Sequence, residues 1–468
     1  MAELHDLTAL EQRSGLRTGA FAPSDLVAHY LERIARIDGA VGAFVEVTGD
    51  AARERATRLA RTAPEGALWG LPFADKDLVA RAGVPTRSGS RLHRDLVPVA
   101  TADQAAVLDE AGGISLGKTS TPEFGLTGYT ETQIGPPTRD PWNLANGAGG
   151  SSGGAAAAVA AGLLPLAPGS DGGGSIRIPA ATVGVVGIKP SRGRVAFASG
   201  LDSPGGLPVA GPIARTVADA ALLLDVQCAG RPHRFATRAP GSGPFLPAAT
   251  VPTAPMRIGV STVSPWDDAE DIRLDADAAH AVEVAAALLT DAGHGVDGFA
   301  WHPRGYAELF TTLWRTSAAR MALSDADLEL VEPITAWLVR EGRRLTGAEV
   351  LQALAAASAF EHATITAFDP FDAVLTPALA LPPQPVGWFD RHDPVRGFSQ
   401  QVQYAPYSSF VNVAGLPAIV LPVTREASGH PVSVQLIGRP GGEAAIIALA
   451  AVLESRVGAM PKPPIWHR

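Results

Sequence analysis

Cysteine is almost absent from this sequence. The one cysteine, Cys228, excludes an internal disulfide, and no group of cysteine and histidine residues has the spacing of a zinc site. No apolar run reaches the roughly 20 residues that a membrane-spanning helix needs, because the longest candidate, 155–168, is broken by Gly162 and Pro165. The first residues are too polar for a signal peptide, so we expect a cytoplasmic protein that has no membrane partner.

Basic clusters are also missing. The formal net charge is −9. The sequence has no cluster of lysine and arginine residues, which argues against nucleic acid as the main partner. Charged residues make up 18% of the chain and hydrophobic residues 46%, which indicates a globular protein. With 468 residues, the chain is long enough to bury a large core.

Glycine, in contrast, is concentrated in the stretch 146–179. It forms two turns, GGSSGG at 149–154 and GGGS at 172–175, and the alanine-rich segment 155–162 between them predicts a buried helix. Glycine loses more backbone freedom on folding than any other residue, so such density indicates unusual dihedrals or close approach to a ligand. Each turn also carries serine, which predicts a hydrolytic site with a nucleophile and a nest of N–H groups.

Lys76 lies in the apolar segment Leu68–Val79, which we expect to be a strand. Two interpretations remain open from the residues alone. The lysine could reach towards solvent or form a buried ion pair with Asp75 or Asp77. Alternatively it could act as a catalytic base, because burial lowers the pKa of a lysine and a base must be partly neutral near pH 7.

Helical and strand patterns alternate along the chain, which predicts a mixed sheet covered by helices on both faces. In the first part, we expect a helix that begins at Pro23 and ends at Gly39. The segment 112–119 matches the nucleotide-loop pattern G-x-x-x-x-G-K-[ST]. A helix is expected before it and apolar residues fall inside it, so we reject a phosphate-binding loop there.

The motifs GGSSGG, GSDGGGSIRIPA, VGIKPSRGRV and LPFADKD resemble those of the amidase signature family. The resemblance extends over nearly the whole chain. It implies an α/β fold with a mixed twisted β-sheet core sandwiched by α-helices, and a single amidase domain over 1–468. Its expected parts are N-terminal helices (1–65), a signature core (66–228), an exposed linker (229–255) and a C-terminal part that completes the sheet and the pocket (256–468).

The resemblance also implies a serine mechanism. Ser175 is the expected nucleophile, and Ser151 is expected to relay its proton to Lys76 in a Ser-cisSer-Lys triad with a cis peptide bond between Gly150 and Ser151. The acyl-enzyme would form without a metal or cofactor. Serine is a poor nucleophile until a neighbouring group removes its proton, and a lysine base is a recognised alternative to histidine.

The residues around the nucleophile have expected supporting roles. The N–H groups of the second turn would form an oxyanion hole together with that of Ser175; the turn residues are Gly172, Gly173 and Gly174. Asp171 and Arg177 are expected to support this loop as an ion pair, and Ser152 to lie behind the site as a hydrogen-bonding residue.

The substrate pocket is less well defined by the sequence. Phe124, Tyr129 and Gln133 are candidates for its wall, although ordinary loop packing explains each of them equally well. The residues that select the substrate would lie in the loops 124–145, 301–345 and 380–408. Aromatic residues in these loops permit an apolar pocket but are equally consistent with core packing: Phe310, Trp314, Trp337, Trp388 and Phe389.

We therefore expect an amidase that hydrolyses small aryl or alkyl carboxylic amides with water, and that also permits anilides, esters or carbamates. Its expected state is a monomer or homodimer. The main alternative is the glutamine-hydrolysing subunit of a tRNA-amidating complex, which belongs to the same family. Members of that group usually carry Gln where this chain has Ile178 and Tyr in the turn that here reads Ser191-Arg192, so both differences favour a free-standing amidase.

Two further alternatives are weaker. The first turn also matches the nucleophile elbow G-x-S-x-G of α/β-hydrolases, with Ser152 as the nucleophile of a Ser-His-Asp esterase. That fold needs an acid and a histidine later in the chain, and neither His430 nor His467 has an evident acid partner. A catalytically silent binding protein is disfavoured because Lys76, Ser151 and Ser175 are all present.

Overall fold

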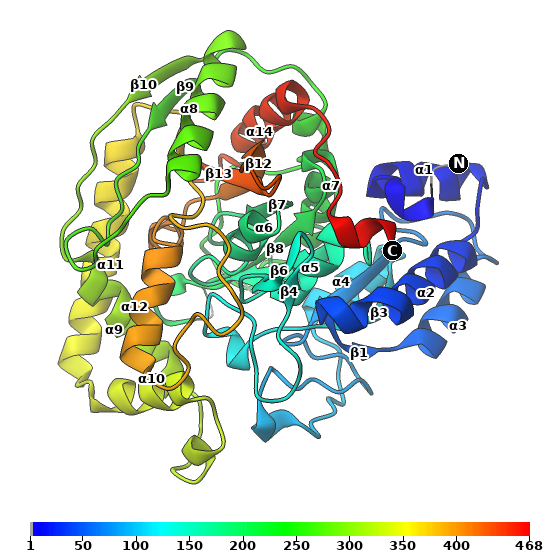
Figure 1. Cartoon of the computed structure of the whole chain (residues 1–468), viewed down its shortest axis with the longest axis horizontal. Helices are drawn as coiled ribbons and strands as arrows, with labels where there is room; N and C mark the ends of the chain where they lie inside the picture. Colours follow the sequence, from blue (N-terminus) through cyan, green and yellow to red (C-terminus); the bar gives the residue numbers. More distant parts are fainter. Residues whose placement is uncertain (1–2, 198, 202) are drawn as a thin grey trace.

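The computed structural model describes residues 3–197, 199–201 and 203–468 (Figure 1). Within them, eight strands form a large sheet in the order β10, β9, β11, β13, β12, β7, β8, β6. Their bounds are Gly295–Gly298, Arg257–Val260, Ala373–Pro377, Pro431–Gly438, Ala418–Arg425, Val186–Lys189, Val209–Ala214 and Leu166–Asp171. Strands β10, β9 and β11 pair in parallel and all later neighbours pair antiparallel, so the sheet is mixed, as predicted.

A smaller sheet lies at the β6 edge of the large one. In the described chain it consists of β1 (Phe44–Val47), β3 (Ile114–Thr119) and β2 (Pro72–Lys76), and β2 lies beside β6. A short hairpin of β4 (Arg139–Asp140) and β5 (Asn143–Gly147) follows. Because β2 and β6 are neighbours, Lys76 at the end of one lies close to Ser170 at the end of the other.

Helices cover both faces of the large sheet, as predicted. One face carries α7 (Val217–Cys228), α8 (Ala276–Asp291) and α14 (Glu443–Val457). The other carries α5 (Gly153–Ala160), α6 (Arg177–Thr182), α9 (Tyr306–Ala319), α11 (Gly347–Phe368) and α13 (Ser409–Val413). Alternation along β13 shows the two layers, because Leu436 packs in one apolar cluster and Ile437 in a second cluster with Phe310 of α9.

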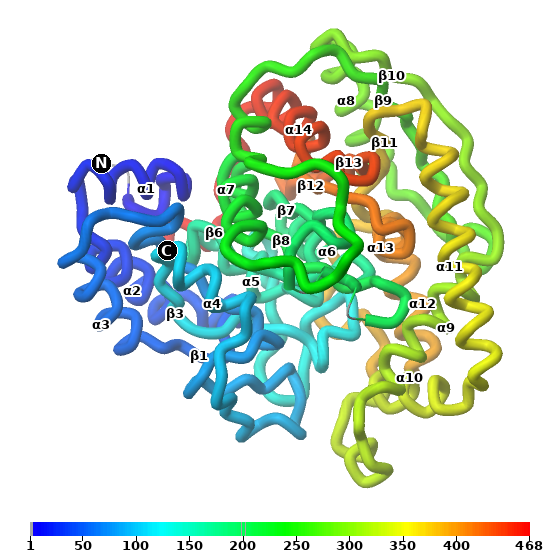
Figure 2. The backbone as a smooth tube through the Cα atoms, turned by 180° about the vertical axis from the view of Figure 1, so that it is seen from behind, coloured from blue at the N-terminus to red at the C-terminus, as the bar shows by residue number. Residues whose placement is uncertain are grey.

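The remaining helices flank this core (Figures 1 and 2). On one side lie α1 (Ala9–Thr18), α2 (Pro23–Val41), α3 (Gly49–Leu59) and α4 (Asp103–Glu110), and on the other α10 (Pro333–Arg344) and α12 (Pro394–Tyr404). The C-terminal turn lies beside α2 in both views. The C-terminal turn also contacts the N-terminal turn, because Trp466 Nε1 donates to Asp6 Oδ1 at 2.9 Å.

Several local expectations are confirmed and others need correction. Helix α5 is buried along its whole length, as predicted. The strand expected over 68–79 is shorter, because only Pro72–Lys76 pairs with β3. Helix α2 continues past Gly39 to Val41, because Gly42 is the residue that adopts the left-handed conformation, with φ of 69°, and ends the helix.

The false nucleotide loop at 112–119 is a strand, as its context indicated. Strand β3 passes through the motif and no loop is left to surround a phosphate. Lys118 is fully buried and donates hydrogen bonds to the Val79 carbonyl and the Thr86 hydroxyl. Its side chain therefore joins β3 to the segment after β2.

The segment 229–255 is mostly exposed but is anchored at several points, among them Arg231, which pairs with Asp103 and Glu110, and Phe245. Phe245 is 2% exposed, and the N–H groups of Phe245 and Leu246 donate to the Asp225 carboxylate at 2.5 and 3.0 Å. The segment is therefore exposed, as predicted, but it is fixed to the core and is not a free linker. The division of the chain into four parts stays a prediction.

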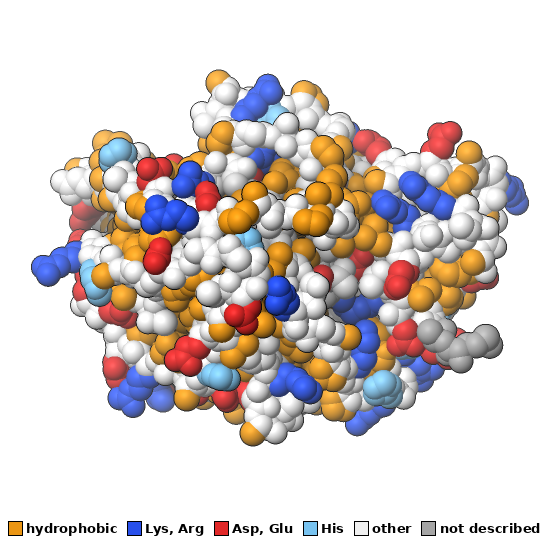
Figure 3. Space-filling view, turned by 90° about the horizontal axis from the view of Figure 1, so that it is seen from above, with side chains coloured by type: hydrophobic (Ala, Val, Ile, Leu, Met, Phe, Trp, Pro, Cys, Tyr) orange, Lys and Arg blue, Asp and Glu red, His pale blue; other side chains and the backbone are white. Residues whose placement is uncertain are grey.

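Two features of the surface and the helices bear on partners. On the face in Figure 3, acidic and basic side chains are interspersed with apolar ones, and neither sign forms a continuous patch. Among the residues that the structure describes, no helix combines the length and hydrophobicity needed to cross a bilayer.

Candidate active site

Lys76 and Ser151 are hydrogen-bonded in the protein interior. Lys76 is the last residue of β2, and Ser151 lies in the first glycine-rich turn, just before α5. Lys76 Nζ lies 2.8 Å from Ser151 Oγ, 3.1 Å from Ser170 Oγ and 3.4 Å from the Ser170 carbonyl oxygen. A neutral amine has two N–H groups and one lone pair, so Ser170 can accept both N–H bonds and leave the lone pair facing Ser151.

The surroundings of Lys76 favour its neutral form. Burial lowers the pKa of Lys76 from its ordinary value of 10.5 to about 7, although the nearby Asp171 carboxylate acts in the opposite direction. The ion pairs considered from the sequence do not form, because Asp75 pairs with Arg81 at 2.7 Å and Asp77 lies 3.9 Å from Lys118. Lys76 is thus partly neutral near pH 7, which a base requires.

The two glycine-rich turns are tied together. The Ser152 N–H donates to the Ser175 carbonyl oxygen at 3.0 Å, and the Ser152 hydroxyl lies 3.3 Å from the Ser170 carbonyl oxygen. The Gly150–Ser151 peptide bond is cis, as the resemblance implies. Ser175 is 9% exposed whereas Ser152 is fully buried, so only the second turn presents its serine towards a cavity.

Asp171 and Arg177 form the expected ion pair, with two contacts of 2.9 Å between guanidinium and carboxylate. Arg177 also donates to the side chains of Asn412 and Gln435, at 2.6 and 2.8 Å. Burial alone would raise the pKa of Asp171, but the charge and hydrogen bonds of Arg177 hold it well below its usual range. The network joins the second glycine-rich turn to α13 and β13 and keeps both charges paired in the interior.

The second turn exposes fewer N–H groups than expected. The Gly174 N–H donates to Asp171 Oδ1 at 2.8 Å, so it is not free to bind an oxyanion. Within the described chain, the N–H groups of Gly172, Gly173 and Ser175 have no hydrogen-bond partner. Gly174 has φ of 129°, and a Cβ there would overlap Ser408, so no other residue fits.

A cavity opens at Ser175 and Gly173. Its wall is formed by side chains from the loop before β4, from α6 and α9, and from α12 and α13. The described lining residues are Leu126, Thr127, Gly128, Gly173, Ser175, Ile178, Trp266, Phe310, Trp314, Phe398, Gln401, Val402, Tyr404, Ala405 and Ser409. Among them are five aromatic side chains but no acidic or basic one, so the cavity suits a neutral, apolar group.

Comparison with known proteins shows the family to which this chain belongs. The family model described as Amidase matches residues 25–447. The chain belongs to the amidase family. The fold and the recognised motifs agree with this membership, and the protein is an enzyme that hydrolyses carbon–nitrogen bonds, as predicted.

The relatives of this chain carry names of several different activities. AmiB2, a Mycobacterium tuberculosis protein named as an amidase, is 38% identical over 96% of this chain and 95% of its own length. A glutamyl-tRNA(Gln) amidotransferase subunit from Synechococcus sp. is 34% identical, over 95% of each chain. The solved structure of 6-aminohexanoate cyclic dimer hydrolase with substrate superimposes with a TM-score of 0.91 at 28% identity, covering 99% of this chain and 100% of that one.

In this amidase the predicted wall residues do not line the cavity at Ser175. Phe124 has φ of 51° and turns into an apolar cluster beside His93. Tyr129 is buried and stacks on Phe389, with ring centroids 4.5 Å apart. Gln133 is half-buried outside the cavity. The residues of this loop that do line the cavity are 126–128.

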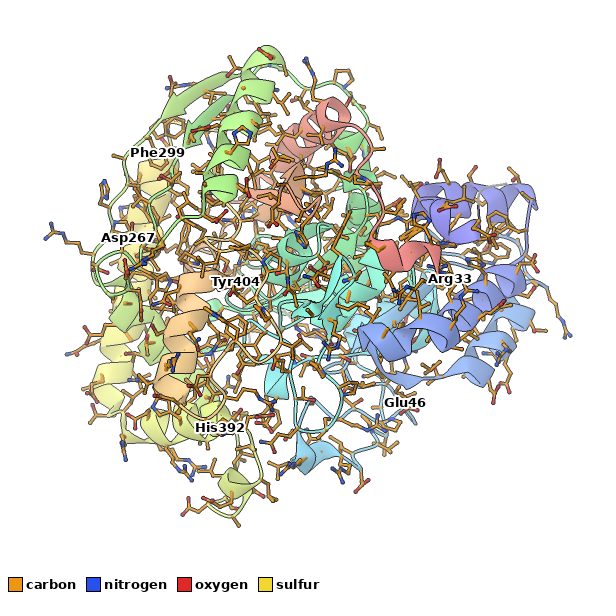
Figure 4. The ribbon with its side chains drawn as sticks, viewed as in Figure 1. Arg33, Glu46, Asp267, Phe299, His392 and Tyr404 are labelled. Carbon is orange, nitrogen blue, oxygen red and sulfur yellow. The ribbon has the colours of Figure 1, made fainter. Side chains whose placement is uncertain are left out.

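The aromatic candidates divide in the same way. Phe310 and Trp314 of α9 line the cavity, whereas Trp337, Trp388 and Phe389 pack elsewhere. Tyr404, labelled in Figure 4, comes from the end of α12 and was not anticipated. Helical spacing in 394–404 gives no sign of which face meets a cavity, because that face is set by packing against distant elements.

The esterase alternative fails on geometry. His430 does have an acid partner, because its Nε2 lies 2.8 Å from Asp140 Oδ2, contrary to the sequence expectation. However, its Nδ1 lies 2.9 Å from the Pro431 carbonyl oxygen, so both ring nitrogens are occupied. Ser152 is bonded to Ser170 instead. The histidine pairs with the β4 hairpin and does not form a triad with Ser152.

Three polar residues at the site were missed. Ser170 precedes Asp171 directly, so its position beside the second turn was a usable signal. Asn412 and Gln435 lie more than 230 residues after Arg177 and resemble ordinary helix and strand residues. Only the folded chain brings them to Arg177, next to the second glycine-rich turn.

Proposed function

We propose that the protein is a serine amidase that hydrolyses neutral carboxylic amides through an acyl-enzyme on Ser175. The observation that carries the proposal is the buried hydrogen bond of 2.8 Å between Lys76 Nζ and Ser151 Oγ. A lysine with its pKa lowered to about 7 can accept a proton from that hydroxyl at neutral pH. In the described structure, the Ser152 hydroxyl bonds to the Ser170 backbone and not to a basic side chain.

In the proposed acylation, Ser175 Oγ attacks the amide carbonyl carbon. Its proton passes to Ser151, whose own proton passes to neutral Lys76. When the C–N bond breaks, the leaving amine takes a proton back from Ser151, and Lys76 restores it. Water then attacks the ester of Ser175 by the same relay and releases the carboxylic acid. Each proton taken from a nucleophile is returned to a leaving group.

The oxyanion would be held by backbone N–H groups. We assign this role to Gly173 and Ser175, which line the cavity, with Gly172 next to them. Gly174 supports them instead, because its N–H holds the Asp171 carboxylate. In serine hydrolases each such donor stabilises the transition state by about 3–4 kcal/mol.

The expected substrate is an amide with an aryl or alkyl group and no net charge near the reacting bond. The described cavity wall has no charged side chain that could pair with a charged substrate. Phe310 and Trp314 stack on one another, with ring centroids 5.4 Å apart, beside the glycines of the second turn. They would hold an apolar group close to Ser175.

The amidotransferase relatives suggest a second candidate function, the hydrolysis of glutamine. Glutamine carries an ammonium and a carboxylate group, and both need polar partners when they are taken out of water. Ile178 lines the cavity at the position where the resemblance implies Gln in that group. The apolar wall therefore favours acyl amides over glutamine.

Labelling and hydrolysis test the proposal together. The protein would be treated with a fluorophosphonate probe and the adduct mapped by peptide mass spectrometry. We expect one adduct on Ser175, lost in Ser175→Ala. Hydrolysis of an acyl anilide and of glutamine would be compared for wild type, Lys76→Ala and the control Lys462→Ala, which replaces a lysine outside the site. Normal anilide turnover by Lys76→Ala, or an adduct on Ser152, would refute the relay.

A further inference from the structure

A second group of chemically active side chains lies outside the cavity at Ser175, where the N-terminal and C-terminal turns are in contact. His5 belongs to the N-terminal turn η1 (Leu4–Asp6), and Glu3 precedes that turn. His29 lies in α2. The C-terminal turn η7 (Pro464–His467) packs against them (Figures 1 and 2). None of these residues lines the cavity at Ser175.

The potential donor atoms of this group converge. His5 Nδ1 lies 3.0 Å from His29 Nε2. One ring nitrogen of each histidine and a carboxylate oxygen of Glu3 all lie within 4.8 Å of one another. Ligand nitrogen atoms on one zinc ion lie about 2.0–2.1 Å from the metal. Two nitrogen atoms held about 3 Å apart can therefore reach one ion with little movement.

The two imidazoles are held by packing and not by loose loops. His5 is 5% exposed, and its ring lies 5.0 Å from the Trp466 ring. Arg33, labelled in Figure 4, fixes that region by donating to the carbonyl oxygens of Ala161, Gly162 and Trp466 at 3.0–3.1 Å. Pre-positioned ligands lose little conformational freedom on binding, which favours a defined ion site.

The group also has room for an ion and water. A hollow of about 550 Å³ lies over it. Its lining includes Glu3, His5 and His29 and both acidic and basic residues, namely Asp6, Glu32, Arg33, Arg36 and Arg468. Glu32 adds a carboxylate near the two histidines, and Arg36 lies 4.0 Å from it. In the described structure, the Glu3 carboxylate has no ion pair, so it remains available as a ligand.

We propose that Glu3, His5 and His29 bind one divalent transition-metal ion of the zinc class. Two imidazoles and one carboxylate form a donor set that such ions prefer, and the open hollow leaves positions for water. The ion would join the N-terminal turn to α2 and stabilise the contact with the C-terminal turn. Because it lies outside the reaction site, it would add to folding stability and leave hydrolysis unchanged.

Calorimetry with untagged, chelator-treated full-length protein tests the site. We expect wild type to bind one equivalent of Zn²⁺ and its Tm to rise with zinc concentration, since a ligand of the folded state stabilises it. His29→Gln and Glu3→Gln should each weaken binding at least tenfold and reduce the rise in Tm. His280→Gln is the matched control, because His280 pairs with Glu283 on α8 and, among the described residues, belongs to no group of three potential ligands.

Two measurements separate specific binding from other effects. Addition of Co²⁺ should give visible absorption bands in wild type that are absent in His29→Gln. The metal-free Tm of His29→Gln should match that of wild type, which shows that the fold is kept. Failure of wild type to bind near-stoichiometric zinc, or unchanged binding in both variants, would overturn the proposal. Amide hydrolysis that required zinc would overturn the assignment to stability alone.

Discussion

Lys76→Met replaces a buried ammonium group by an apolar side chain of similar length and measures what burial of that charge costs. Burial lowers the pKa of Lys76 from 10.5 to about 7. At about 1.4 kcal/mol for each tenfold change in proton affinity, the cost of keeping Lys76 protonated in the folded protein is about 5 kcal/mol. The substitution removes this cost together with the proposed base.

The burial cost of Lys76 makes the stability of wild type depend on pH. Unfolded Lys76 binds a proton up to pH 10.5, whereas folded Lys76 releases it near pH 7. Between these values the unfolded chain binds more protons, so the stability of wild type rises with pH. The burial cost is about 4 kcal/mol at pH 7 and about 2 kcal/mol at pH 9, and it vanishes above the unfolded pKa.

The variant also loses hydrogen bonds. Ser151 and Ser170 are left without the lysine, which costs about 1–3 kcal/mol, and this loss does not depend on pH in the same range. Buried Lys189, whose pKa burial also lowers to about 7, titrates in both proteins and cancels in the difference. We therefore expect the stability of Lys76→Met relative to wild type to fall by about 2 kcal/mol between pH 7 and pH 9.

Urea unfolding at pH 7, 8 and 9 measures this change. The free energies are compared where tryptophan fluorescence and circular dichroism give coincident transitions, since only then is a single unfolding free energy defined. Activity should be absent from the variant at every pH. A difference in stability that stays constant from pH 7 to pH 9 would refute the lowered pKa and, with it, the role of Lys76 as a base.

Three further outcomes follow from particular contacts. Ser170→Ala removes an acceptor that favours protonated Lys76, so the rise of kcat/KM with pH should move to lower pH while kcat falls about 10- to 100-fold; an unchanged pH profile would contradict this. Trp314→Ala should raise KM about tenfold for an aryl amide but not for acetamide, because only the larger group reaches the cavity wall; equal effects on both would count against the assigned pocket. Gly42→Ala should lower the free energy of unfolding by more than about 1 kcal/mol, since φ is 69° and the added Cβ would lie 2.8 Å from the Pro137 carbonyl oxygen. Gly39→Ala inside α2 should instead raise it by about 0.5–1 kcal/mol. Thermal or urea unfolding measures both changes.

The sequence was most informative where chemistry is encoded locally. The two glycine turns, the buried helix between them and the pairing of Asp171 with Arg177 all lie within 34 residues, and each could be predicted. Lys76 and Ser151 are 75 residues apart, and the family resemblance was needed to join them. Gly174 was assigned wrongly because all N–H groups of a glycine run look alike until a buried carboxylate selects one of them.

Contacts between distant segments could not be predicted. Asn412 meets Asp171 across 241 positions, and nothing in its local pattern distinguishes it from other helical asparagines. The loop 124–145 was correctly expected to reach the cavity, but backbone direction decides which side chains face it. Phe124 and Tyr129 face neighbouring aromatic rings instead. The group of Glu3, His5 and His29 has no sequence spacing typical of a zinc site, because its histidines come from separate segments.

The site is assembled from two stretches of chain with separate tasks. The proposed reacting groups come from 76–177, whereas most of the cavity wall comes from 266–409. The stretches are joined near the nucleophile through Arg177, which bonds to Ser408 and Asn412. Evolution can therefore exchange the wall and leave the catalytic half intact, provided that this joint is kept. A chimera that takes 306–405 from another family member should acquire that member's substrate range while it retains the same nucleophile.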